Sequence, residues 1–390
     1  LLILAGMLAM DRVHGGVDCV TFCRSRLGAV PTALLATPFA LYIAVMVTWI
    51  TLGVSEFMVS TSMRDTPPYV FNGLILASAA MTVRSGIEAM TRLSILLFAI
   101  QVMLIAGALL VSIPNMTFSF VLPVLQDGWL PVLHGVYFLY GFPFGEIIIF
   151  TLLLHYMNRE KPGAAQQAPA GQAAGGQAPS GQPSAQQAAG GQAPPGQPAG
   201  QQAADGQAPP GQPAGQQASG GQAPEKPLSG GHALLRWMTP GRALTIAVLL
   251  NGALLFAITV ATIMIFGPVA AEMKFSLYSI SRLIDVGDFF QRIESVIGIS
   301  LIAGSYIKVT IALYALNEIL FRMFGVSDEK LMVLPAAAVC FLWTLTMFEF
   351  DSEFTEKFTS YWPLMNLTFA AVPLAFSGVV ALFGRPPSPA

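Results

Sequence analysis

Residues 131–157 read PVLHGVYFLYGFPFGEIIIFTLLLHYM, an apolar stretch long enough to cross a lipid bilayer but interrupted near its middle. A membrane-spanning helix needs about 20 mostly apolar residues. The interruption is Tyr140-Gly141-Phe142-Pro143-Phe144-Gly145-Glu146. Proline removes a backbone donor and clashes with the preceding turn, and glycine lets the chain leave helical geometry. The stretch therefore predicts a membrane helix that breaks between Gly141 and Gly145.

The composition of the whole chain agrees with a membrane protein. Of its 390 residues 54% are hydrophobic and only 10% are charged, with a mean hydropathy of +0.64. Soluble domains carry about 25% charged residues, so the composition excludes a soluble enzyme. The net charge of −2 offers no basic surface to a nucleic acid. We expect an all-α polytopic membrane protein.

Further apolar blocks predict the other spans. Together with 131–157 they give eight full helices, at about 31–57, 66–83, 93–113, 131–157, 243–266, 295–321, 331–348 and 362–383. Leu1–Met10 is apolar but too short to span, and it stops at Asp11-Arg12. We interpret it as the inner end of a ninth helix, and therefore expect an N-terminally truncated chain.

The orientation follows from the distribution of Lys and Arg. If Leu1–Met10 ends on the cytoplasmic side, thirteen Lys and Arg residues fall inside, five fall outside, and Lys308 lies within the bilayer. Cytoplasmic loops carry the excess of positive charge in membrane proteins. The segment 11–28 is then predicted at the inner surface and 274–290 on the outer face.

A segment between two of the predicted spans has no means of packing. Gly163–Pro224 is almost entirely Gly, Gln, Ala, Pro and Ser, and it repeats every 15 residues without a large apolar side chain. Such a composition cannot bury a core, which predicts disorder rather than a stacked solenoid. We therefore expect a membrane domain in two parts, 1–162 and 229–390, joined by a disordered cytoplasmic linker at 163–228.

The interrupted helix is the first candidate site. A broken helix within a membrane is tolerated only where its free backbone groups are buried in protein or meet a ligand. Such breaks mark the substrate sites of many transporters. The alternative is a plain proline kink at a packing contact. Because Glu146 lies beside the break, we predict a ligand site formed by Tyr140, Gly141, Phe142, Pro143, Phe144, Gly145 and Glu146.

Ionisable groups inside a membrane are functional candidates. Lys308 is the second one, and either couples ion movement or closes a structural ion pair. Glu56 lies near the outer end of its span and is expected to reach toward solvent. Arg84, Glu88 and Arg92, spaced i, i+4, i+8, predict a charge ladder on one exposed helix face.

Motifs for catalysis, metals and cofactors are missing from the sequence. Cys19 and Cys23 with His14 lack a fourth zinc ligand nearby. No HExxH, P-loop, GxSxG or dinucleotide-binding fingerprint occurs. We expect no enzyme activity, no cofactor and no metal.

Several motifs resemble those of one family, the B subunits of spore germinant receptors (GerAB-type proteins) of the amino acid–polyamine–cation (APC) transporter superfamily. The matching stretches, in chain order, are Thr66-Pro67, the segment Arg84-Ser85-Gly86-Ile87-Glu88-Ala89-Met90-Thr91-Arg92, Leu122-Pro123-Val124, Gly128-Trp129-Leu130-Pro131, Phe144-Gly145-Glu146, Gln291-Arg292-Ile293-Glu294 and Tyr306-Ile307-Lys308. The resemblance covers the chain outside 163–224, an insert that is atypical of the family.

This resemblance implies a ten-helix, LeuT-like inverted-repeat bundle in which the helix at 131–157 is the sixth and binds substrate. The superfamily's other broken helix, the first, is absent here, so this chain alone would not complete the site. Family members act with an A subunit and a lipoprotein C subunit in the inner membrane of the spore, where they detect nutrients such as amino acids. A proton-coupled amino acid permease, with Glu146 or Lys308 in coupling, is the alternative.

Overall fold

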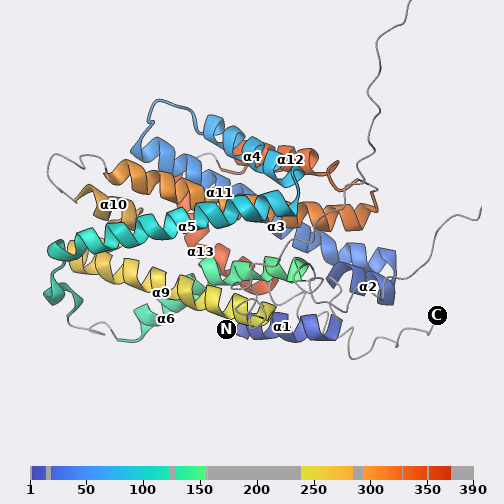
Figure 1. Ribbon diagram of the computed structural model, residues 1–390, viewed down its shortest axis with the longest axis horizontal. Coiled ribbons are helices and arrows are strands. Elements are labelled where there is room, and N and C mark those ends of the chain that lie inside the picture. The colour runs from blue at the N-terminus through green and yellow to red at the C-terminus, as the bar shows by residue number, and fades with distance from the viewer. Residues whose placement is uncertain are drawn as a thin grey trace, which may run out of the picture. The chain divides into compact units, whose positions relative to one another are not determined.

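The computed structural model describes residues 2–14, 19–122, 128–154, 156, 239–283, 293–326, 328–348 and 351–369 (Figure 1). These residues belong to one compact unit formed by Leu1–Ala164 and Met238–Ala390. A second unit, Ala165–Trp237, lies outside the described residues. The linker predicted at 163–228 lies there too, as does the end of the last predicted span, so both stay predictions.

The described part of the chain contains helices and no strands. Its α-helices are α1 (Leu2–His14), α2 (Cys19–Leu27), α3 (Ala29–Thr61), α4 (Pro68–Arg84), α5 (Ile87–Ser112), α6 (Leu130–Leu139), α9 (Pro240–Phe266), α10 (Ser276–Arg282), α11 (Ile293–Phe324), α12 (Val333–Thr346) and α13 (Asp351–Ser360). Short turns of tighter or wider helix are η1 (Ile113–Asn115), η2 (Phe118–Val121), η3 (Tyr140–Phe144), η4 (Gly145–Leu152) and η6 (Gly267–Glu272). Residues 362–369 are also helical.

Five of these segments are long and apolar enough to cross a membrane. They are Val30–Thr61, Ile87–Asn115, Leu130–Leu152, Gly241–Glu272 and Ile293–Phe324. The sequence predicts eight spans, and the difference arises at the shorter helices. Helix α4 has 17 residues and α12 has 14, and only the first part of the last predicted span is described. The chain is an integral membrane protein of the all-α class.

Helix α11 lies at the centre of the packing, against α3, α4 and α5 (Figure 1). Its residues Val309, Ala312 and Leu313 are fully buried and belong to one core cluster with Ile43 and Val47 of α3. Lipid tails are as apolar as these side chains, so helix association in a membrane depends on close van der Waals packing. Small residues such as Ala312 permit that close approach.

The predicted charge ladder is wrong as a single helix face. Helix α4 ends at Arg84, and Gly86 at φ +97° turns the chain before α5 begins at Ile87. This left-handed conformation favours glycine, which ends one helix and allows the next to start in a new direction. Only Glu88 and Arg92 share a helix, as an exposed ion pair at 2.5 Å.

Candidate functional site

The membrane segment that contains α6 is broken where the sequence predicts. Helix α6 ends at Leu139, η3 forms one turn of π-helix, and η4 continues as a 3₁₀-helix. Phe142 is the residue that leaves helical geometry, with φ −140° and ψ 119°, and the Phe142–Pro143 peptide bond is cis. The predicted break between Gly141 and Gly145 is therefore confirmed.

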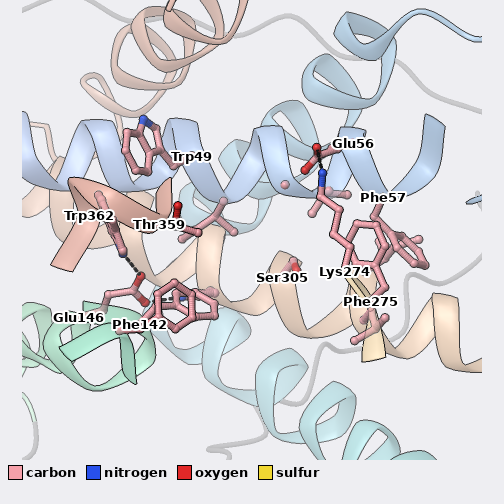
Figure 2. Close-up of a pocket in the computed structure, with 17 residues that line it drawn as sticks. Trp49, Glu56, Phe57, Phe142, Glu146, Lys274, Phe275, Ser305, Thr359 and Trp362 are labelled. Atoms are coloured by element: carbon pink, nitrogen blue, oxygen red, sulfur yellow. Dashed lines mark hydrogen bonds and ion pairs between the residues drawn. The ribbon is translucent and has the colours of Figure 1, made fainter. Parts of the chain in front are cut away.

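A cavity of about 470 Å³ lies beside this break (Figure 2). Its walls come from α3, from the broken segment, from α11 and from residues 274–275, 359 and 362. The lining residues are Trp49, Ile50, Gly53, Val54, Glu56, Phe57, Phe138, Phe142, Glu146, Lys274, Phe275, Leu301, Ile302, Ser305, Lys308, Thr359 and Trp362. A mostly apolar lining with a few polar groups is typical of a small-molecule site.

One end of the cavity, called here the Lys308 end, holds a buried ion pair. Lys308 Nζ pairs with Glu146 Oε2, and the Trp362 indole N–H donates to Glu146 Oε1 at 3.1 Å. The Glu146 side chain is only 4% exposed. Lys308 Nζ also lies 4.0 Å from the centroid of the Phe142 ring, a favourable cation–π distance. The ammonium therefore links α11 to the point where the helix breaks.

Aromatic rings support this end. The rings of Trp49 and Trp362 lie 4.9 Å apart, and Tyr42 stacks on Trp362 at 5.8 Å. Asn366 accepts a hydrogen bond from the Tyr42 hydroxyl, which anchors helix 362–369 to α3. Trp362 is thereby held in position to donate to Glu146.

The opposite end, called here the Lys274 end, holds a second ion pair. Lys274, which precedes α10, pairs with Glu56 of α3. Next to this pair the Phe57 ring makes edge-on contacts with Phe275 at 5.0 Å and Tyr278 at 5.3 Å. The expectation that Glu56 reaches solvent is wrong, because its side chain is 9% exposed and lines the cavity.

The residues predicted at the break separate into two groups. Phe142 and Glu146 line the cavity with Lys308, whereas Tyr140, Gly141, Pro143, Phe144 and Gly145 do not. Both glycines lie against helix 362–369 instead. A β-carbon added to Gly141 would lie 2.5 Å from Pro363 Cα, and one added to Gly145 would lie 2.9 Å from Asn366 Cβ.

We expect Gly141→Ala to destabilise the protein by roughly 1–3 kcal/mol, the usual range for overpacking, because the obstructing atom is backbone. Thermal unfolding of the detergent-solubilised protein and its amount in membranes measure this. Gly135→Ala on α6 is the matched control, since its added β-carbon meets nothing within 4 Å. Equal stability of the two variants would contradict the packing constraint at Pro363.

Sequence reasoning missed several residues of the cavity. Trp49, Gly53 and Ser305 lie in largely apolar or small-residue stretches, where no local pattern distinguishes a cavity wall from a lipid-facing or packed surface. Trp362 carried one signal, since a buried indole N–H needs an acceptor. Lys274 carried another, as a cation in the segment predicted to cover the outer face.

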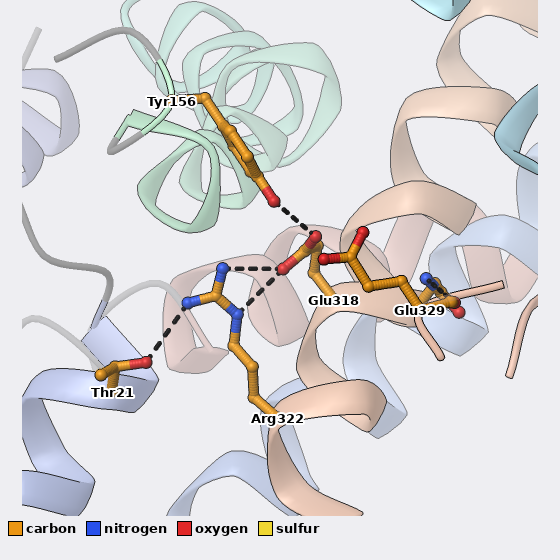
Figure 3. Close-up of polar contacts among 6 residues, drawn as sticks. Thr21, Tyr156, Glu318, Arg322 and Glu329 are labelled. Atoms are coloured by element: carbon orange, nitrogen blue, oxygen red, sulfur yellow. Dashed lines mark hydrogen bonds and ion pairs between the residues drawn. The ribbon is translucent and has the colours of Figure 1, made fainter. Parts of the chain in front are cut away.

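A second polar cluster joins the broken segment to α11 (Figure 3). The Tyr156 hydroxyl donates to Glu318 Oε1 at 2.7 Å, and Arg322 donates through Nε to Glu318 Oε2 at 2.9 Å. Arg322 Nη1 reaches Thr21 Oγ1 of α2 at 3.4 Å. The Glu318 side chain is 3% exposed, so this cluster is a buried connection among three elements.

Two side-chain links thus connect the broken segment to α11, and the links are the same number of residues apart in both. Glu146 pairs with Lys308, and Tyr156 binds Glu318, so each partner in the second link lies ten residues after its counterpart in the first. The segment from the break to Tyr156 is fastened to α11 at both ends.

Comparison with known proteins identifies the family. The profile of the family described as spore germination protein matches residues 1–168 and 236–353. The chain belongs to the spore germination protein family. This confirms the resemblance drawn from the motifs. The match omits most of the Gly-, Gln- and Pro-rich insert, in agreement with its atypical composition.

One relative within this family is spore germination protein KB of Bacillus subtilis (strain 168). It is 30% identical over 138 residues, which is 35% of this chain and 37% of that protein. The matched part therefore spans little more than a third of that relative. No solved structure matches the chain.

Proposed function

We propose that this spore germination family protein is the membrane subunit of a germinant receptor, and that it senses a small nutrient such as an amino acid. One observation carries the proposal: the cavity beside the broken helix contains a carboxylate and an ammonium side by side, Glu146 and Lys308. An α-amino acid carries the two complementary groups on adjacent atoms. Its ammonium fits Glu146 and its carboxylate fits Lys308.

Binding of such a ligand would act on the Glu146–Lys308 pair. A zwitterion that inserts between the two side chains replaces one buried ion pair by two, and it moves Lys308 of α11 relative to the break. A ligand shifts a conformational equilibrium only by its difference in affinity for the two states. Contacts to both segments provide such a difference, which partner subunits would detect.

The remaining features of the proposal come from the family resemblance. The partners are the A and C subunits, and the location is the inner membrane of the spore. The fold is a ten-helix inverted-repeat bundle of the APC type, in which the first broken helix completes the site. From its composition and from the distribution of Lys and Arg, and not from the family, we propose that residues 163–228 form a disordered cytoplasmic linker without a catalytic role. The proposal involves no catalysis, no cofactor and no nucleic acid.

The test separates sensing from transport. Spores that lack this gene are expected to lose germination with one nutrient, and to regain it only when this protein, the A subunit and the C subunit are all present. Uptake of that radiolabelled nutrient by cells that express the full-length protein alone is expected to stay at background. Germination that persists in the deletion strain would contradict the proposal.

A proton-coupled amino acid permease is the second candidate. The observation that favours it is the burial of the Glu146 carboxylate within the membrane at a cavity, since such groups form proton relays in transporters. Uptake by the protein alone, driven by a proton gradient, would support this candidate against the receptor.

A further inference from the structure

The wall that α3 contributes to the cavity has a gap in its middle. Trp49, Gly53 and Glu56 all line the cavity and are spaced i, i+4, i+7, which places them on one face of the helix. Trp49 lies at the Lys308 end, through its contact with Trp362, and Glu56 lies at the Lys274 end. Gly53, without a side chain, lies between them.

Helix α11 has the same arrangement on its own wall. Leu301, Ser305 and Lys308 line the cavity with the same i, i+4, i+7 spacing. The middle position is again the smallest, and Figure 2 shows Ser305 between the two ion pairs. Both helices therefore carry a small residue in the part of the cavity wall between the two charged ends.

None of the residues that the structure describes fills the space beside Gly53. A β-carbon built at this position meets no other atom within 4 Å, whereas one at Gly141 or Gly145 would collide with neighbours. Packing against another helix thus does not require a glycine here. Glycine inside a helix is less stable than alanine, so the presence of Gly53 needs a reason other than helix stability.

We infer that Gly53 determines ligand specificity by leaving room for the ligand's side chain, and that the ligand is an amino acid with a bulky apolar side chain, branched or aromatic. The inference rests on the proposed function. The ammonium and carboxylate of the ligand occupy the Lys308 end, and its side chain fills the space between Gly53 and Ser305.

The lining between the ion pairs accounts for the apolar preference. Ile50, Val54 and Phe138 are apolar, as are Leu301 and Ile302. The four charged lining residues form two pairs with each other, Glu146 with Lys308 and Glu56 with Lys274. A charged ligand side chain would have to disrupt a pair or lose its water without compensation.

The space between Gly53 and Ser305 accounts for the bulk. The whole cavity, as the described residues line it, has a volume of about 470 Å³, in the range of pockets that hold drug-sized ligands. The single methyl of alanine would leave the middle unfilled. Each additional buried methylene is worth about fourfold in affinity, so a side chain of leucine size gains more than tenfold over alanine.

The experiment measures binding of radiolabelled L-alanine, L-leucine and L-phenylalanine to membranes that contain the full-length protein with its partner subunits. In the wild-type protein, leucine and phenylalanine are expected to bind at least tenfold more tightly than alanine. Gly53→Leu is expected to weaken phenylalanine binding at least tenfold and to change alanine binding less than threefold. Gly53→Ala should weaken phenylalanine binding less than Gly53→Leu does, and should again affect alanine binding least.

Gly107→Leu on α5 is the matched control, because a β-carbon there also meets nothing within 4 Å and Gly107 does not line the cavity. It should change none of the three affinities. Alanine binding as tight as leucine in the wild type, or equal effects of Gly53→Leu on all three ligands, would overturn the inference.

The same experiment distinguishes this inference from the proposed function. If alanine alone binds and its binding is lost in Lys308→Met, the proposed site stands and only the assignment of Gly53 and the bulky side chain fails. If none of the three amino acids binds to the wild-type membranes, both fail.

Discussion

Lys308→Met is expected to abolish the nutrient response and to lower the amount of protein in the membrane. The substitution leaves the carboxylate of Glu146, which is 4% exposed, without its cation. Removing one partner of a buried ion pair costs about 3–5 kcal/mol, because the other charge stays buried. Immunoblots of membrane fractions and germination assays on the same spores measure the two effects.

A double variant separates the structural effect from the functional one. Glu146→Gln combined with Lys308→Met removes both charges, so the protein level is expected to recover. The response should stay lost, because no charged group remains to bind the zwitterion. Lys357→Met is a control at a pair with Glu353 that is more exposed than Glu146–Lys308, where only a small cost is expected. A double variant that responds like wild type would reduce the pair to a structural role.

Glu318→Gln is expected to cost a similar amount of stability, about 3–5 kcal/mol, at the second link. The glutamine keeps an acceptor for Tyr156 but removes the negative charge with which Arg322, whose side chain is 16% exposed, pairs in this cluster. Thermal unfolding of the purified protein in detergent gives the change in stability. Glu88→Gln is the control, since Glu88 and Arg92 are more than three-quarters exposed and their pair contributes below about 1 kcal/mol.

Tyr156→Phe refines this second prediction. It removes the hydrogen bond to Glu318 and leaves the Glu318–Arg322 pair intact, so the expected loss is about 1 kcal/mol. If Glu318→Gln and Tyr156→Phe lower the stability by the same small amount, the Glu318 cluster is open to water and is not a buried link.

The sequence predicted those parts of the site that depend on local chemistry. Gly141, Pro143 and Gly145 act on their own backbone, so the break at Phe142 could be located without any tertiary information. Lys308 stood out because a charge inside a span is costly wherever the helix packs. Its partner Glu146 lies in the same predicted site.

The rest of the site depends on which helices meet. Glu56 is near the end of a span, and only the approach of Lys274 from a segment more than 200 residues later decides that it is buried. Gly141 was expected to open the backbone toward a ligand, but the packing of Pro363 explains it. The prediction that Arg84, Glu88 and Arg92 share one helix face is wrong for a local reason, because Gly86 separates two helices.

The 3₁₀ winding of η4 affects the distance between Glu146 and Tyr156, the two residues that link the broken segment to α11. Runs of 3₁₀-helix longer than three or four residues are uncommon, and η4 has eight. Rewinding these residues as α-helix would shorten them by roughly 4 Å and rotate one end by roughly 160° against the other. The part of α11 from Lys308 to Glu318 would keep its length. A change in the winding of η4 would therefore move Tyr156 relative to Glu146, while Lys308 and Glu318 keep their spacing on α11.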